Sequence, residues 1–231
     1  MKKIILITIL LFLAVPLTKA GGLTLIEKIL KQGETKVYVQ FVPVIHDPGA
    51  VGGSTSPCAS KKFDEVTEFT SDFKAHTDKI IKMLNDRMEI EALKKGDITA
   101  VPVKKEMNGM KIYDWSKAED PFFALVTVSG SYKASADPSS GGVENSLWIP
   151  AQLQFIEMDG EKMDIVEQTS LGTVISAKKT SKSCEGIDYF KENFPLDDHI
   201  EKFEENYTNK IERFAKKHLK KYKKAMKKKK K

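Results

Sequence analysis

The sequence LWIPAQLQFIEMDGEKMDIVEQTSLGTVIS, residues 147–176, contains the clearest structural pattern in this chain of 231 residues. Its first twelve residues alternate between apolar and polar side chains, as at Leu153 and Gln154, which is the period of a strand with one buried face. Asp159-Gly160 then supplies a turn pair, and residues 163–176 return with weaker alternation. The stretch therefore predicts an antiparallel β-hairpin.

Other segments predict the strands around this hairpin. Residues 122–132, FFALVTVSGSY, are apolar at consecutive positions in their first half, which is typical of an interior strand buried on both faces. Residues 36–45, KVYVQFVPVI, are rich in β-branched and aromatic side chains and predict a strand that ends near Pro43. We expect a short edge strand over residues 98–103.

Two segments before the hairpin have the periodicity of amphipathic helices. A short helix is expected over residues 23–30. A longer apolar stripe with spacings of three, four and seven runs from Phe63 to Met88, and Gly96 follows two lysines as its expected end.

A long helix is expected at the carboxyl end of the chain. It follows Pro195, Asp198 and Glu201 have the spacing of a capping box, and its apolar face continues to Tyr222. The order of elements predicts an α+β domain, in which two long helices pack on one face of a mostly antiparallel sheet.

The amino terminus has the features of a secretory signal. Two lysines precede an apolar run over residues 4–17, which is too short for a membrane span of about 20 residues. Small residues then occupy the positions before the expected cleavage between Ala20 and Gly21. We therefore expect an exported protein, periplasmic or secreted. Its expected parts are a signal peptide (1–20), a single domain (21–222) and a basic tail (223–231).

The two cysteines, Cys58 and Cys184, both lie in the part expected to be exported. Two thiols in an oxidising compartment generally pair, and closing so long a loop contributes ~4–5 kcal/mol in the chain-entropy model. We predict a Cys58–Cys184 disulfide, with two buried free thiols as the alternative. No second Cys or His stands close enough to either cysteine for a zinc site, so no metal is predicted.

Charge is divided unevenly along the chain. Residues 210–231 contain twelve lysines and one arginine against the single Glu212, which leaves the rest of the expected mature chain near −9. A mildly acidic domain that ends in a basic helix predicts contact with an anionic envelope component, including a membrane surface, or with a protein partner. The predicted contact residues are Lys216, Lys217, Lys220, Lys221, Lys223, Lys224, Lys227, Lys228, Lys229, Lys230 and Lys231.

Nucleic-acid binding and solubility are two alternative roles for these lysines. No aromatic residues alternate with the final lysines to stack on bases, so nucleic acid is disfavoured as the partner. The same lysines could serve only as a solvated helix end that keeps the protein in solution.

The sequence contains few candidate catalytic residues or motifs. His46-Asp47 is the best candidate acid–base pair, although an Asp beside Pro-Gly usually bonds its own backbone. No serine has the GxSxG frame, and the loop over residues 49–56 lacks the lysine of a phosphate-binding loop. We predict a protein without catalysis and without a cofactor.

The order of strand, long helix, FALVTVSGSY strand and hairpin resembles one group of periplasmic modules. The group comprises the amino-terminal domain of the Tol-Pal translocation protein, the curli-secretion lipoprotein and the lipoprotein activators of penicillin-binding proteins. Residues 120–130 and 152–173 stand where that group has its corresponding strands. The resemblance implies a non-catalytic interaction domain. Those lipoproteins carry a Cys directly after the signal, whereas this chain has Gly21, so no lipid anchor is implied.

These observations predict an exported accessory or binding protein of the cell envelope, tied by a disulfide and ending in a basic helix. Two alternatives stay open. One is a carrier of a lipid or small apolar ligand in a cavity between sheet and helices. The other is a hydrolase centred on His46 and Asp47.

Overall fold

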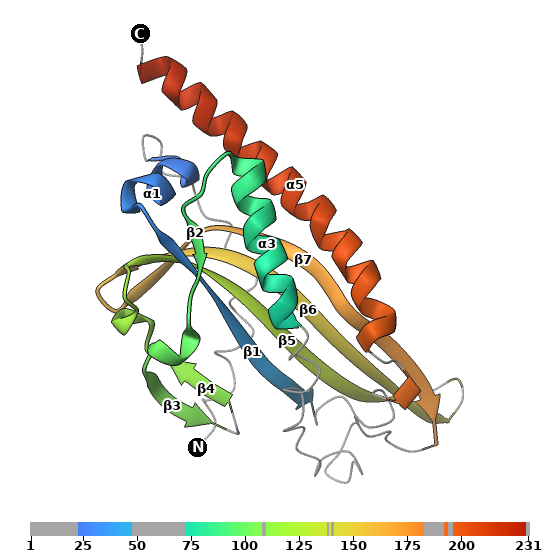
Figure 1. Cartoon of the computed structure of the whole chain (residues 1–231). Coiled ribbons are helices and arrows are strands. Elements are labelled where there is room, and N and C mark those ends of the chain that lie inside the picture. The colour runs from blue at the N-terminus through green and yellow to red at the C-terminus, as the bar shows by residue number, and fades with distance from the viewer. Residues whose placement is uncertain are drawn as a thin grey trace.

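The elements of the chain confirm the predicted α+β class. The computed structural model of the protein describes residues 23–47, 73–107, 110–137, 139, 141–182, 192–193 and 196–229. In order, these form α1 (Leu25–Gln32), β1 (Thr35–Asp47), α3 (Phe73–Met88), β2 (Leu93–Lys95), a 3-10 turn at Ile98–Ala100, β3 (Val103–Met107), β4 (Met110–Tyr113), a 3-10 turn at Trp115–Lys117, β5 (Phe122–Asp137), β6 (Gly142–Asp159), β7 (Lys162–Ser181) and α5 (Leu196–Lys229) (Figure 1).

One five-stranded sheet organises the fold, in the order β2-β1-β5-β6-β7. The two longest pairings, β5 with β6 and β6 with β7, are antiparallel, and the second is the hairpin predicted from residues 147–176. Gly160 has a φ of 61° in its turn, which suits a glycine. Strand β1 pairs in parallel with both β2 and β5, so the sheet is mixed at that end. Strands β3 and β4 form a separate antiparallel pair.

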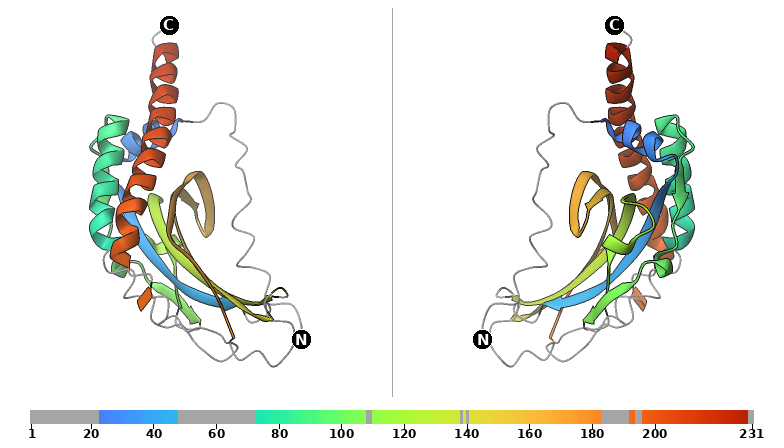
Figure 2. Two further views of the ribbon diagram at one scale, coloured as in Figure 1. Left: turned by 90° about the vertical axis from the view of Figure 1, so that its right-hand side faces the viewer. Right: turned by 90° about the vertical axis from the view of Figure 1, so that its left-hand side faces the viewer.

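The main core lies between one face of the sheet and the helices. Figure 2 shows α1, α3 and α5 on the same side of the sheet, so the two long helices share a face as predicted. The ring of Phe155 in β6 stacks on that of Phe214 in α5, with centroids 6.0 Å apart. Gly172 of β7 has a φ of 125°, and a Cβ there would stand 3.5–3.7 Å from Asn206 and Phe203, so α5 lies directly on this strand.

A second, smaller cluster covers part of the opposite face of the sheet. Trp115 stacks on Phe123 of β5 with ring centroids 5.0 Å apart, and Tyr38 and Leu125 are buried beside them. The neighbouring Ala124 and Val126 of β5 belong instead to the main core. Strand β5 is therefore buried on both faces in its first half, which confirms the prediction from FFALVTVSGSY.

Helix α3 ends earlier than the sequence suggested, and this prediction was wrong. It stops at Met88, because Glu89 takes a left-handed φ of 58°, and the chain returns to form β2. Gly96 therefore ends no helix. A Cβ on Gly96 would lie 2.7 Å from ring carbons of Tyr38, so this glycine allows close packing on an aromatic side chain.

Three other elements begin or end at residues that differ from the prediction. Residues 98–100 form a 3-10 turn, in which Asp97 accepts a hydrogen bond from the Thr99 amide at 2.9 Å, and a strand starts only at Val103. Strand β1 continues beyond Pro43. A register shift between Val42 and Ile45 accommodates this proline, which has no N–H to donate to the neighbouring strand. Helix α5 begins at Leu196, so Asp198 lies in its first turn and not at its cap.

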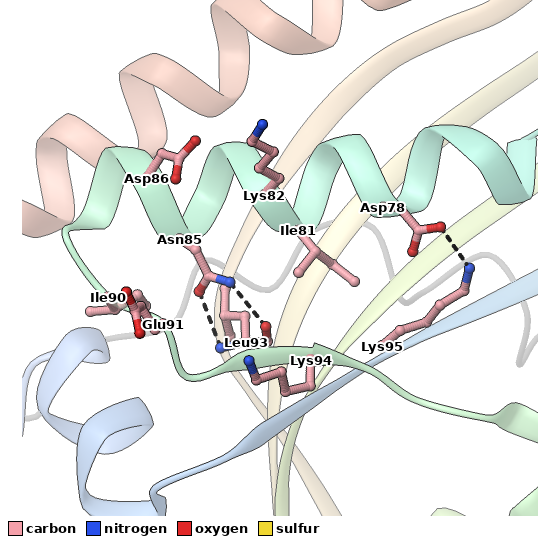
Figure 3. Close-up of a pocket in the computed structure, with 10 residues that line it drawn as sticks. All are labelled: Asp78, Ile81, Lys82, Asn85, Asp86, Ile90, Glu91, Leu93, Lys94 and Lys95. Atoms are coloured by element: carbon pink, nitrogen blue, oxygen red, sulfur yellow. Dashed lines mark hydrogen bonds and ion pairs between the residues drawn. The ribbon is translucent and has the colours of Figure 1, made fainter.

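Asn85 of α3 closes the outer edge of β2. Its Nδ2 donates to the Leu93 carbonyl at 3.0 Å, and its Oδ1 accepts from the Leu93 amide at 3.1 Å (Figure 3). The Ala92 carbonyl accepts from the Thr35 amide of β1, and Leu93 stands opposite Thr35 in this parallel pair, so the backbone groups of Leu93 face away from β1. One side-chain amide thus takes the place of a neighbouring strand.

Removing this amide should destabilise the protein. Asn85→Ala leaves the amide and carbonyl of Leu93 without their partner, and we expect the free energy of unfolding to fall by about 1–3 kcal/mol. Urea denaturation of wild type and variant measures the difference. The control is Asp86→Ala, which truncates an exposed neighbour on the same helix. Equal stability of Asn85→Ala and wild type would contradict the role given to Asn85.

Candidate anionic-surface-binding helix

Helix α5 is 34 residues long, about 50 Å, and has one buried side. Phe203, Tyr207, Ile211 and Ala215 are almost fully buried at successive turns and fix that side against the sheet and α3. The helix continues through Lys229, so residues 223–229 of the predicted tail are helical. Figure 1 shows its last turns extending past α1.

The first group of predicted contact lysines is already paired with acids of the body. These lysines connect α5 to β7, to the end of α3 and to α1, and so act as clamps on the helix. The pairs are Lys217 and Lys221 with Glu167 at 3.2 and 3.4 Å, Lys223 with Glu89 at 2.7 Å, and Lys229 with Glu27 at 2.7 Å.

The pKa of Glu27 shows that such a clamp favours the charged form of the carboxyl group. The hydrogen bond from Lys229, followed by those from Thr24, lowers the pKa of Glu27 to about 2. Thr24 and Glu27 also form a reciprocal capping box at the start of α1. The last described turn of α5 is therefore joined to the first turn of α1.

The second group forms a continuous line on the solvent side of α5. Its members are separated by three or four residues, the spacing that places side chains on one helix face. All are exposed, and none forms an ion pair or side-chain hydrogen bond with another residue that the structure describes. We call this group the outer cationic stripe; it comprises Arg213, Lys216, Lys220, Lys224 and Lys227.

The stripe is unfavourable for the helix that carries it. Like charges three or four residues apart cost about 0.2–0.5 kcal/mol per pair, and the stripe contains four such steps. The helix dipole compensates cations only in the last turn, so it does little for Arg213, Lys216 or Lys220. Folding alone therefore gives no reason for this arrangement.

Arg213 was absent from the residues predicted from the sequence. The prediction began with the lysine pairs, although the spacing from Arg213 to Lys216 already continued the same face. Lys228 is exposed beside the stripe, whereas Lys230 and Lys231 lie outside the described residues. The predicted cleavage site at Ala20 and Gly21 and both cysteines, Cys58 and Cys184, also lie outside them.

His218 lies beneath the clamps, on the buried side of α5. Its side chain is 1% exposed, its ring centroid lies 4.4 Å from that of Phe214, and its Nε2 is 3.7 Å from the Glu167 carboxylate. Burial lowers the pKa of His218 to about 4 in spite of this carboxylate. Burial also opposes ionisation of Glu167, but the hydrogen bond and charge of Lys217 and the charge of Lys221 favour the carboxylate, and the pKa of Glu167 lies below its ordinary value. The sequence had indicated no partner for His218.

His76 is also structural. It is buried on α3, its Nδ1 lies 3.2 Å from the Tyr207 hydroxyl, and Glu204 lies 3.6 Å away. Burial, with Glu204 nearby, raises the pKa of Tyr207. These contacts connect α3 to α5. Among the described residues no group of three or more His, Cys, Asp or Glu side chains gathers as a metal would require.

The structure places only the backbone of the other candidate pair, His46 and Asp47. They are the last residues of β1, in register with Tyr132 and Lys133 of β5, whereas the sequence predicted a strand that ends near Pro43. Their side chains lie outside the described part of the structure. They therefore stay an untested prediction.

A hollow of about 390 Å³ lies between α3 and β2 (Figure 3). Some of its polar groups bond to one another: Lys95 pairs with Asp78 at 3.0 Å, and Asn85 bonds to the backbone of Leu93. Six of its ten lining residues are charged, and Ile81, Ile90 and Leu93 are its apolar members. This composition does not favour an apolar ligand.

In the described part of the chain, no helix is both long enough and apolar enough to cross a bilayer.

Comparisons with known proteins leave the function open. No protein-family model and no curated protein matches the chain. A solved structure described as a neuraminyllactose-binding hemagglutinin homolog from Helicobacter pylori is 12% identical, with a TM-score of 0.32, over 84% of this chain and 91% of that one. A hypothetical protein from Chlamydia trachomatis is 10% identical, with a TM-score of 0.29, over 80% of this chain and 98% of that one. Likenesses this distant carry no argument about function.

Acid should destabilise the protein through His218. As the pH falls from 7 to 4.5, an unfolded histidine with a pKa near 6.5 takes up a proton that the buried ring does not. We expect this difference to remove about 2–3 kcal/mol of stability, a loss that His218→Phe should abolish. Urea denaturation at both pH values measures it.

The control for this experiment is His199→Asn, at a half-buried position near the start of α5. Glu167 should contribute little in this window, because a carboxyl whose pKa is lowered by folding loses most of its stabilisation below its ordinary pKa of 4.5. The same loss of stability in wild type and His218→Phe would contradict the assignment.

Proposed function

We propose that the protein is an exported, non-catalytic accessory protein of the cell envelope that binds an anionic surface through the outer cationic stripe. The observation that carries this proposal is the contrast between two sets of cations on one helix. Acids of the body pair with the clamping lysines, while the stripe has no partner in the described residues. The secretory signal predicted for residues 1–20 supports export.

The shape of the stripe favours an extended partner. Lys227 lies fourteen positions after Arg213, which corresponds to about 21 Å along the helix axis. A surface with many negative charges can face all five side chains at once, whereas a small anion meets only one or two. Each lysine near an anionic membrane contributes roughly 1 kcal/mol, and the interaction weakens with salt.

The carrier and hydrolase alternatives gain no support from the described residues. The hollow between α3 and β2 is lined mainly by charged groups, and the side chains of His46 and Asp47 are not described. The resemblance to periplasmic interaction modules agrees with a binding role and stays a prediction.

The proposal predicts that neutralising the stripe weakens surface binding. The variant Lys216→Gln, Lys220→Gln, Lys224→Gln, Lys227→Gln keeps every clamp and should remain folded, because it removes repulsion within the helix. We expect its affinity for vesicles of phosphatidylcholine with one quarter phosphatidylglycerol to fall about a hundredfold or more at low salt. Co-sedimentation at 50 and 500 mM NaCl measures the loss and its salt dependence.

A matched control separates the stripe from net charge. Lys94, Lys104, Lys105 and Lys111 are exposed on β2, β3 and β4, and their replacement by Gln removes the same charge. We expect this control to bind within about threefold of wild type. If both variants lose the same affinity, net charge accounts for binding, and the stripe has no special role.

A further inference from the structure

A second hollow opens beside the stripe, between α5 and the outer edge of β7. Its volume is about 350 Å³. The α5 wall supplies three cations on one flank of the helix, and the β7 wall supplies an amide and two hydroxyls. The polar residues that line it are Gln168, Thr169, Ser170, Lys210, Arg213 and Lys217.

Arg213 stands out in this hollow because arginine is rare in the protein. The chain has 38 basic residues, of which Arg87 and Arg213 are the only arginines. Arg87 pairs with Glu212, whereas Arg213 is exposed and has no carboxylate partner in the described chain. A guanidinium presents a rigid fork of donors that matches two oxygens of a phosphate or carboxylate, which a lysine cannot do.

The remaining walls of the hollow suit an oxyanion. Lys210 directs its Nζ toward the Ser170 hydroxyl at 3.4 Å, so a second cation and a hydroxyl stand on the same side. Lys217 lies on the other side and also contacts Glu167 at 3.2 Å. The carboxylate of Glu167 opposes an anion here, but Lys217 and Lys221 both lie within 3.4 Å of it.

We propose that this hollow holds a phosphate group, bound by the Arg213 fork with Lys210 and the β7 hydroxyls. The inference rests on the proposed function and refines it, because Arg213 belongs to both the stripe and the hollow. The stripe attracts an anionic surface along its length, and the hollow selects the chemistry of one group on that surface. A phospholipid headgroup and free phosphate both present this group.

Nuclear magnetic resonance tests the site directly, because the two arginines give only two Nε–H signals. We expect inorganic phosphate to shift the Arg213 signal saturably and to leave the Arg87 signal in place. Bicelles containing phosphatidylglycerol form the second arm. A shift with bicelles but not with phosphate assigns the site to a lipid headgroup, and a shift with both shows that the phosphate group alone suffices. No shift in either arm would overturn the proposal.

A charge-conserving variant separates recognition from simple attraction. Arg213→Lys keeps the charge but loses the fork, and we expect it to weaken phosphate binding at least fivefold, as followed by the amide signals of residues 168–170. The control Lys220→Gln removes one charge outside the hollow and should change phosphate binding less than twofold. Unchanged binding by Arg213→Lys, or equal weakening by Lys220→Gln, would refute a built site.

The two proposals can fail separately. The fourfold lysine variant retains every residue of the hollow, so it should still show the Arg213 shift with inorganic phosphate. If wild type binds no vesicles but the shift saturates, the surface proposal falls and the hollow stands. If vesicles bind through the stripe and Arg213 never shifts, the hollow alone is refuted.

Discussion

The packing of α5 on the sheet is the constraint on which the rest of the structure depends. Phe155 and Phe214 stack across this interface, and Gly172 allows the helix to lie directly on β7. A helix has no freedom of rotation once one side is buried in this way, so the direction of every other side chain follows from its position in the sequence. The line from Arg213 to Lys227 faces solvent for that reason.

The same interface divides the cations of α5 into two kinds. Lysines at the margins of the buried side reach acids on neighbouring elements and hold the helix in place, as Lys229 does with Glu27. Exposed pairs of this kind are individually weak, but together they join α5 to α1, α3 and β7. The residues of the outer cationic stripe form no such pair with any acid that the structure describes. The function that we propose depends on these solvent-facing cations.

Much of the fold and part of the candidate site could be predicted from the sequence. The features that could not be predicted share a physical cause. Periodicity identified the β6–β7 hairpin, the doubly buried β5 and the apolar face of α5, because each depends on residues close in the sequence. The pairing of Lys229 with Glu27 joins residues 202 positions apart, so no local pattern marks it. The prediction that the helix ends at Gly96 failed for the same reason. Strand β2 and the ring of Tyr38, which lie outside α3, determine where the helix stops and why residue 96 is a glycine.

The side-chain amide of Asn85 has a consequence for a protein that would gather on a surface. Molecules concentrated in two dimensions meet often, and an open sheet edge then invites strand-to-strand polymerisation. At one edge, β2 has only three residues, and the outward groups of its first are already occupied. At the other edge, three register irregularities interrupt β7 and α5 lies along it. Crowded copies of this protein can therefore stay individual molecules.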